Sequence, residues 1–199
     1  MNKRILGVGG SPRKNGNSDR MLLEILKGVE LEGLETEAVF LRDYHYSSCV
    51  GCEACRTDKA CTRLLDGMQL IYPKVMESRG LVLASPAHNY NVSALMKAFI
   101  DRLYQFYDFT DDHPRAYSSR LAGQERKAVA AGVAEQLEDK DMGFTIQGMV
   151  LPLKALGYEL VDRISVLGHF HRGRVAKDPQ ALQACSEAGQ ALARALREG

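Results

Sequence analysis

The sequence lacks an excess of charge of either sign and lacks a long hydrophobic run. Its 199 residues carry 26 Lys and Arg against 25 Asp and Glu, for a formal net charge of +1. Proteins that bind nucleic acid concentrate positive charge on one face, and this chain intersperses both signs. No apolar stretch approaches the roughly 20 residues needed to cross a bilayer. We therefore expect neither nucleic acid nor membrane among the partners.

A secretory signal is also missing from the first residues, MNKRILGVGGSPRK. Their apolar run is too short for a signal-peptide core, and no cleavage site follows it. We expect a cytoplasmic protein. Disulfides rarely persist in that reducing compartment, so the clustered cysteines should serve another purpose.

Strand-like and helix-like segments alternate along the chain without a repeat or a linker. The length and the 45% hydrophobic content suit one domain over residues 1–199. Repeated βαβ connections require a parallel sheet that is covered on both faces. The sequence therefore predicts an α/β fold, a three-layer α/β/α sandwich with a five-stranded parallel sheet. The expected strands are at 4–8, 36–41, 80–85, 127–132 and 160–168, and the expected helices at 18–31, 68–76, 93–107, 144–156 and 179–197.

Two segments interrupt this alternation, a cysteine-rich loop at 43–66 and an irregular insertion at 107–126. We expect Ser93 to cap the helix that it opens, and Pro73 to delay or kink the helix around it. Ligands of doubly wound sheets bind at the carboxyl ends of the strands, so the loops that follow them matter most.

The loop GGSPRKNGNS at 9–18 follows the first strand and opens the first helix. A helix N-terminus offers free N–H groups and positive dipole, which together bind phosphate. The triphosphate loop and the dinucleotide fingerprint both fail, because Lys is missing after Gly16 and Pro12 replaces the third glycine. The loop predicts a phosphomonoester site, against the alternative of an ordinary polar turn. Its side-chain donors are Ser11, Arg13, Asn17 and Ser18.

A second loop, SPAHNYNV at 85–92, follows the third strand. Its backbone groups can pair with the polar edge of a heteroaromatic ring, and His88 and Tyr90 can cover or flank that ring. Polar-aromatic loops are common, so this loop alone decides little. Beside a phosphate loop on a neighbouring strand, it favours a mononucleotide with a flat ring.

Taken in order, GSPRKNGNS, SPAHNYNVSALMKAFIDR and the cysteine loop resemble the flavodoxin-like NADPH-dependent FMN reductase superfamily. The nearest branch is the iron–sulfur flavoproteins, and GRVAKDPQAL at 173–182 extends the likeness to nearly the whole chain. The resemblance implies FMN, with its phosphate on the four donors named above. It also implies a flavin contact around Gly132 and contacts to the isoalloxazine ring from Pro86, Ala87, His88, Asn89, Tyr90, Asn91 and Val92.

Four of the five cysteines fall in the stretch CVGCEACRTDKAC, at Cys49, Cys52, Cys55 and Cys61. Three thiolates at two-residue intervals with a fourth nearby are typical of a cubane cluster. The resemblance implies a [4Fe–4S] centre near the FMN of a partner subunit. A bare or redox-active thiol loop and a zinc site remain as alternatives. In each case the nearby cations Arg56, Lys59 and Arg63 would stabilise thiolates or an anionic cluster.

The remaining candidates carry less weight. Cys185 lies in an apolar helical pattern and is expected in the core. We expect His169 and His171 at a surface or interface, and Asp101 and Arg102 in structural roles. No nucleophile–base pair is evident, so we predict no catalytic side chain, because the flavin would carry the chemistry.

The leading hypothesis is an FMN-dependent oxidoreductase or electron-transfer protein of the iron–sulfur flavoprotein type. One alternative is a cluster-free NAD(P)H-dependent FMN, quinone or azo reductase, and another is a non-catalytic flavin carrier or sensor. Expected partners are a ferredoxin-like protein or a small redox molecule, with NAD(P)H as a candidate donor. The resemblance also implies a homodimer or homotetramer.

Overall fold

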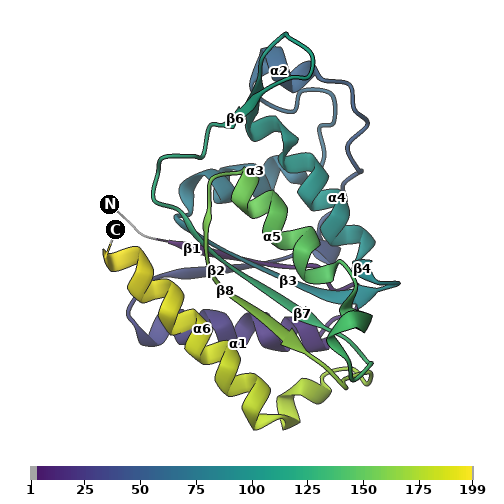
Figure 1. Ribbon diagram of the computed structural model, residues 1–199, viewed down its shortest axis with the longest axis vertical. Coiled ribbons are helices and arrows are strands. Elements are labelled where there is room, and N and C mark those ends of the chain that lie inside the picture. Colours follow the sequence, from purple (N-terminus) through teal and green to yellow (C-terminus); the bar gives the residue numbers. More distant parts are fainter. Residues whose placement is uncertain (1–3, 199) are drawn as a thin grey trace.

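The computed structural model describes residues 4–198 and confirms the three-layer α/β architecture (Figure 1). Five parallel strands run in the order β2-β1-β3-β7-β8, and a short β4 pairs antiparallel with the end of β3. The strand order reverses between β1 and β3, which is where doubly wound sheets bind ligands. The strands are β1 (Ile5–Gly9), β2 (Thr36–Phe40), β3 (Gly80–His88), β4 (Asn91–Val92), β7 (Lys127–Val133) and β8 (Glu159–Val166).

Helices cover both faces of this sheet (Figure 1). One face carries α1 (Asn17–Leu31) and α6 (Pro179–Glu198). The other carries α3 (Met68–Glu77), α4 (Ala94–Arg102) and α5 (Thr145–Ala155). Within residues 4–198, no helix is both long and apolar enough to span a membrane.

The central strands β1, β3 and β7 are largely buried on both faces, and alternate residues enter two separate cores. Leu81 and Leu83 pack under α3, α4 and α5, whereas Val82 packs under α1 and α6. This period of two is the one that a strand covered on both sides requires. Cys185 is fully buried in the α1–α6 core, as expected, and burial raises the pKa of its thiol to about 12.

The backbones of α1 and α6 approach closely because two glycines face each other's helix. A Cβ on Gly28 would lie 2.2 Å from the Ser186 oxygen, and one on Gly189 would lie 2.0 Å from the Ile25 oxygen. Any larger residue would force the helices apart. This close packing against the long helix α6 fixes the position of α1, whose N-terminus lies at the carboxyl ends of the strands.

The structure differs from the prediction between α4 and β7. The helix expected at 93–107 ends at Arg102, and one 3₁₀ turn (Leu103–Phe106) leads into β5 (Tyr107–Phe109). β5 pairs with β6 (Tyr117–Ser119), so the insertion at 107–126 contains a hairpin. The hairpin packs on the preceding turn, where Tyr104 stacks on Phe109 with ring centroids 4.9 Å apart, and aromatic residues favour strands.

Two smaller expectations concern α3 and α4. Pro73 does not delay α3, which begins at Met68 with Pro73 inside it. Ser93 caps α4 as predicted, and its hydroxyl accepts a hydrogen bond from the N–H of Met96. The cysteine-rich loop at 43–66 holds one short helix, α2 (Ala54–Asp58).

Candidate functional site

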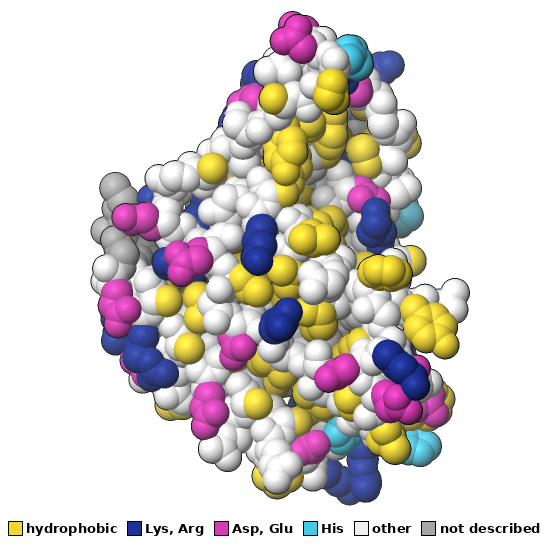
Figure 2. Space-filling model, viewed as in Figure 1, with side chains coloured by type: hydrophobic (Ala, Val, Ile, Leu, Met, Phe, Trp, Pro, Cys, Tyr) yellow, Lys and Arg dark blue, Asp and Glu magenta, His cyan; other side chains and the backbone are white. Residues whose placement is uncertain are grey.

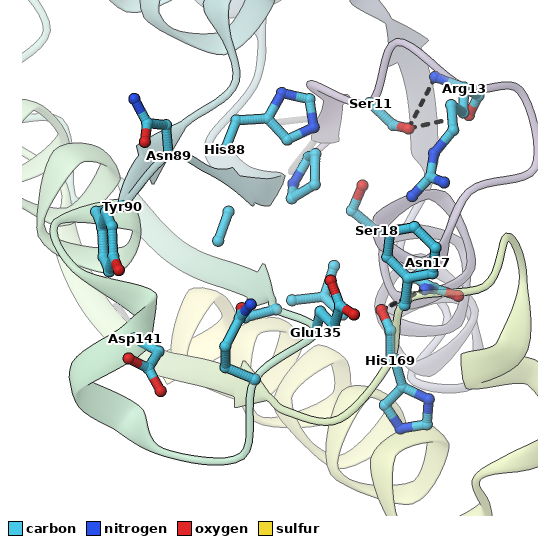
Figure 3. Close-up of a pocket in the computed structure, with 16 residues that line it drawn as sticks. Ser11, Arg13, Asn17, Ser18, His88, Asn89, Tyr90, Glu135, Asp141 and His169 are labelled. Atoms are coloured by element: carbon cyan, nitrogen blue, oxygen red, sulfur yellow. Dashed lines mark hydrogen bonds between the residues drawn. The ribbon is translucent and has the colours of Figure 1, made fainter.

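A cleft of about 480 Å³ opens at the carboxyl ends of β1, β3 and β7 (Figure 3). Its walls come from the loop after β1, the end of β3, the loop after β7 and the segment before α6. The lining residues are Ser11, Arg13, Asn17, Ser18, Pro86, Ala87, His88, Asn89, Tyr90, Val133, Ala134, Glu135, Gln136, Asp141, His169 and Phe170.

The loop after β1 is a compact turn that closes on the N-terminus of α1. The Ser11 hydroxyl donates to the Arg13 carbonyl at 2.9 Å and accepts from the Arg13 N–H at 3.1 Å. The N-cap is Gly16, whose N–H donates to the Asp19 carboxylate at 3.3 Å. A Cβ on Gly16 would lie 2.7 Å from the Ser11 Oγ, so glycine is needed there. The first N–H groups of α1 therefore face the cleft in a fixed turn.

Two of the predicted phosphate donors are available to a ligand. Ser18 is buried and lines the cleft, and its Oγ has no hydrogen-bond partner within the described residues. The Arg13 side chain is exposed and reaches from the loop toward Ser18 (Figure 3). A buried hydroxyl without a partner is costly, and an anionic oxygen placed between Ser18 and Arg13 would satisfy it.

Asn17 lines the cleft and also joins two segments that are far apart in the sequence. Its Nδ2 donates to the His169 carbonyl at 2.9 Å, and its Oδ1 accepts from the Val175 N–H at 3.2 Å. The side chain thus ties the segment before α6 to the rim of the cleft. One amide hydrogen of Asn17 remains for a ligand.

The first two loops are joined through Ser93. Its hydroxyl donates to the Gly10 carbonyl at 2.5 Å, and its N–H donates to the Ser85 Oγ at 3.0 Å. A Cβ on Gly10 would lie 2.8 Å from the Met96 Cβ, so the turn after β1 packs directly on the first turn of α4. The phosphate loop and the β3 loop are therefore held in a fixed relative position.

The loop after β3 is a tight hairpin in which Asn89 and Tyr90 have φ of 51° and 64°. Two central residues with positive φ make a type I′ turn between β3 and β4, and a bulky residue is rare there. The Tyr90 carbonyl accepts from the Phe144 N–H at 2.7 Å. Gly143, at φ 54°, leaves room for this contact, because a Cβ there would lie 2.3 Å from the Tyr90 oxygen. A neighbouring loop thus holds the strained turn at the edge of the cleft.

Most of the predicted ring contacts line the cleft, namely Pro86, Ala87, His88, Asn89 and Tyr90. Asn91 and Val92 form β4 and do not line it. Gly132 lies inside β7 under α5, where a Cβ would meet Ile146 at 2.9 Å. The third wall begins one residue later, with Val133, Ala134, Glu135 and Gln136. We had expected this wall around Gly132, but a strand end is difficult to place to one residue from sequence.

Sequence reasoning gave the His169 segment too little weight. His169 and Phe170 line the cleft, and the His169 Nε2 lies 2.8 Å from the Asp178 carboxylate. Asp178 also accepts from the N–H of Ala181 and so caps α6. The backbone N–H of Ala181 and the His169 side chain hold the pKa of Asp178 below its usual value. The only signal in the sequence was the position of an Asp directly before the helix-opening Pro179.

The four clustered cysteines surround a second cavity, of about 180 Å³, which shares no lining residue with the cleft. Cys49 and Cys52 are exposed, and Cys55 and Cys61 are partly buried. Burial raises the pKa of the Cys55 thiol, and the other three thiols raise it further. Among residues 4–198, no three metal-binding side chains converge on a single-ion site.

Two of the three cations expected to stabilise these thiols pair with carboxylates, and the third, Arg63, lines the cavity. Arg56 pairs with Asp111 at 3.1 Å, and Lys59 pairs with Asp108 at 2.5 Å. The cation that reaches a sulfur is Arg102, whose Nη2 lies 3.5 Å from the Cys61 Sγ. Sequence reasoning placed Arg102 in a structural role without identifying this contact.

Comparison with known proteins places these features in a family. Residues 3–151 match the family described as NADPH-dependent FMN reductase. The chain belongs to this family. Its cleft at β1, β3 and β7 lies almost entirely within the matched residues, apart from the wall formed by His169 and Phe170.

Within the family, curated relatives carry the name iron–sulfur flavoprotein. The chain is 35% identical over 99 residues to one from Methanocaldococcus jannaschii, covering 50% of this chain and 51% of that protein. It is 39% identical over 103 residues to one from Archaeoglobus fulgidus, covering 52% and 46%. The chain thus spans about half the length of the curated relatives that it matches.

Solved structures share the family fold at low identity. An FMN-dependent NADH-azoreductase from Bacillus anthracis, in complex with FMN, superposes with a TM-score of 0.67 at 16% identity, covering 97% of this chain and 100% of that one. An NAD(P)H:quinone oxidoreductase from Methanothermobacter marburgensis gives 0.71 at 15% identity, covering 96% and 98%. At this identity the likeness supports the fold alone.

Proposed function

We propose that this chain is an FMN-dependent oxidoreductase or electron-transfer protein of the iron–sulfur flavoprotein type. The observation that carries the proposal is the unpartnered Ser18 hydroxyl, buried at the N-terminus of α1 beside Arg13. A singly esterified phosphate is the group whose charge and oxygens suit that position. The cleft continues from there to β3, where a flat ring would lie.

The residues of the cleft divide into two sets. Ser18, Arg13 and the first N–H groups of α1 would hold the phosphate, with one remaining hydrogen of Asn17. Pro86 to Tyr90 and Val133 to Gln136 would hold the isoalloxazine ring through backbone and side-chain contacts. FMN, when bound, supplies hydride and one-electron chemistry, so the protein needs only to bind, orient and shield it.

The walls of the cleft decide what reaches the ring. Tyr90 is 61% exposed and Phe170 is 55% exposed, and both line the cleft. Such aromatic side chains can cover the ring or a flat substrate and exclude water. Glu135 and Asp141 add negative charge to the lining, with Asp141 on the side of Tyr90 and Glu135 nearer to Asn17 (Figure 3).

The cysteine loop would hold a [4Fe–4S] cluster in this proposal. Four cysteines around one small cavity are the ligand set that such a cluster needs. Figure 1 shows this loop, around α2, at the top of the molecule and apart from β4, which lies near mid-height at the edge of the sheet. We therefore propose that electrons pass between the cluster of one subunit and the FMN of another.

A face suited to such an assembly lies between α4, α5 and the β5–β6 hairpin. Figure 2 shows hydrophobic side chains gathered there. Tyr117 is 57% exposed and Leu151 is 62% exposed, and both line an open groove with Tyr104, Tyr107 and Pro152. A homodimer or homotetramer that buries this groove belongs to the proposal, as does a cytoplasmic location that keeps the thiols reduced.

Anaerobic purification, followed by absorbance spectroscopy and assays of flavin, iron and sulfide, tests this function. We expect one FMN and four iron atoms per chain. Reduction by a ferredoxin-like carrier should then be faster than reduction by NADH or NADPH. One FMN without iron or sulfide, even after reconstitution, would remove the cluster. Absence of flavin would remove the proposal as a whole.

A second candidate is a cluster-free NAD(P)H-dependent FMN, quinone or azo reductase. The exposure of Cys49 and Cys52 favours it, since free and exposed thiols are not held in place as ligands by packing. Rapid flavin reduction by NADPH in protein without iron would support this candidate. Bound FMN without turnover of any donor would instead indicate a flavin carrier or sensor.

A further inference from the structure

Arg102 joins both stems of the cysteine loop. Its side chain is 1% exposed, at the end of α4. Nη1 donates to the Ser47 carbonyl at 2.9 Å, and Nη2 donates to the Leu64 carbonyl at 3.2 Å. The two Nη atoms of the guanidinium also donate to the two carboxylate oxygens of Asp66, at 2.8 Å and 3.2 Å. One buried guanidinium therefore fixes the chain before Cys49 and the chain after Cys61.

Cys61 is held in place by hydrogen bonds to its backbone and to its sulfur. Its N–H donates to the Gln105 Oε1 at 2.8 Å, and its carbonyl accepts from Gln69 at 2.9 Å. Its sulfur accepts from Arg102 Nη2 at 3.5 Å. Tyr72 also orients the guanidinium, because Arg102 Nε donates to its hydroxyl at 3.0 Å. The sulfur thus has a defined position and a positively charged donor.

We propose that Arg102 is the positioning residue of the cysteine site, which holds the Cys61 sulfur as a preformed ligand and stabilises the reduced state of the cluster. This inference rests on the proposed function. One-electron reduction by a reduced carrier, which is itself oxidised, adds negative charge to the cluster and its sulfurs. A hydrogen-bond donor to a cluster sulfur stabilises that charge and raises the reduction potential.

Arg102→Lys tests the proposal, and Arg126→Lys is its matched control. Lysine keeps the charge beside Asp66 but loses the fork that reaches the sulfur. Arg126 is equally buried, donates to the Val75 carbonyl and to the Tyr158 hydroxyl, and contacts no cysteine. Both variants are reconstituted anaerobically with iron and sulfide. FMN content, iron content and the midpoint potential of the cluster are then measured.

We expect Arg102→Lys to favour the oxidised cluster about tenfold, a shift of about 59 mV to more negative potential. Arg126→Lys should keep the wild-type potential, and both variants should keep the wild-type FMN content. Tyr72→Phe is a second variant for the case that Arg102→Lys does not fold. It keeps the ring that packs edge-on against Phe106 and removes the hydroxyl that orients Arg102. The equilibrium should therefore shift about threefold toward the oxidised cluster, which lowers the potential by about 28 mV.

Two results separate this inference from the function on which it rests. A loaded Arg102→Lys or Tyr72→Phe protein with the wild-type potential overturns the inference and leaves the cluster in place. Wild-type protein that holds FMN but takes up neither iron nor sulfide removes the cluster and the inference together.

Discussion

The cleft at the ends of β1, β3 and β7 and the cysteine loop at 43–66 are held by different kinds of contact. The cleft is fixed by backbone geometry at the turn with Gly16 and the hairpin with Asn89 and Tyr90, and by Ser93, which bonds to the loop after β1 and to the end of β3. The cysteine loop lies outside the sheet, and Arg102 fixes its stems. Around its tip, the ion pairs are largely exposed.

This difference separates a rigid site from an adjustable one. A cleft built into the sheet edge keeps its shape without a ligand, so its loops lose little conformational entropy when a cofactor binds. A loop held by one buried cation and by surface ion pairs has lower local stability, and a bound cluster would complete it. Substitutions in one site should therefore leave the other unchanged.

The largest effect is expected at Gly143. Gly143→Ala places a methyl group against the Tyr90 carbonyl at positive φ, so the free energy of unfolding should fall by about 3 kcal/mol. Gly123→Ala is the control, because Gly123 also has positive φ but has no atom within 4 Å of the added Cβ. Gly123→Ala should lower the free energy of unfolding by about 1 kcal/mol. Urea unfolding measures both values, and equal losses would show that the hairpin contact contributes nothing.

A slightly smaller effect is expected at the phosphate donor. Arg13→Ala should raise the Kd for FMN about a hundredfold, or about 2.7 kcal/mol, because a charged two-pronged contact is lost. Arg20→Ala removes an exposed cation further along α1 that does not line the cleft and should leave the Kd unchanged. Flavin fluorescence titration gives both constants. Iron uptake should be unaffected, and a parallel loss of iron would mean that the two sites are coupled within a subunit.

Asp178 should give a moderate and pH-dependent effect. Asp178→Ala removes the cap of α6 and the partner of His169. The free energy of unfolding should therefore fall by about 1 kcal/mol at neutral pH. The pKa of this carboxyl is lowered in the folded protein, so its contribution is present above about pH 3.9 and lost as pH falls through the lowered value. Urea unfolding at several pH values should show the wild type and the variant converging in acid. If the free energies of unfolding of the two proteins differed by the same amount at every pH, the loss would come from packing and not from the charge of Asp178.

The smallest effect is expected at the rim of the cysteine loop. Lys59 pairs with Asp108, and its side chain is 51% exposed. Lys59→Ala should therefore lower the free energy of unfolding by about 0.5 kcal/mol, and 1 M salt should remove most of this difference. A loss of several kcal/mol that persists in salt would contradict the description of this loop as loosely held.

Much of the fold could be predicted, because its signals are local. The buried strands, the amphipathic helices and the Ser93 cap follow from the spacing of apolar residues and from one hydroxyl. The turn after β1 was also recognisable, since its position after a strand and before a helix predicts a phosphate site. These signals extend over a few residues and need no knowledge of distant contacts.

The parts that were missed depend on long-range contacts. Asn17 looked like a phosphate ligand, and only the fold shows that it bonds to His169 and Val175. Arg102 looked structural, because no pattern in the sequence reveals that its fork reaches Cys61. The hairpin at 107–126 was missed because its strands are three residues long, too short to show a period.

The central claim is that the cleft holds FMN through its phosphate, and one comparison tests it directly. Anaerobic fluorescence titration of flavin-free protein with FMN and with riboflavin isolates the phosphate, since the two ligands share the ring. The account predicts that FMN binds at least about a hundredfold more tightly, or about 2.7 kcal/mol. Equal affinity for the two flavins would contradict it.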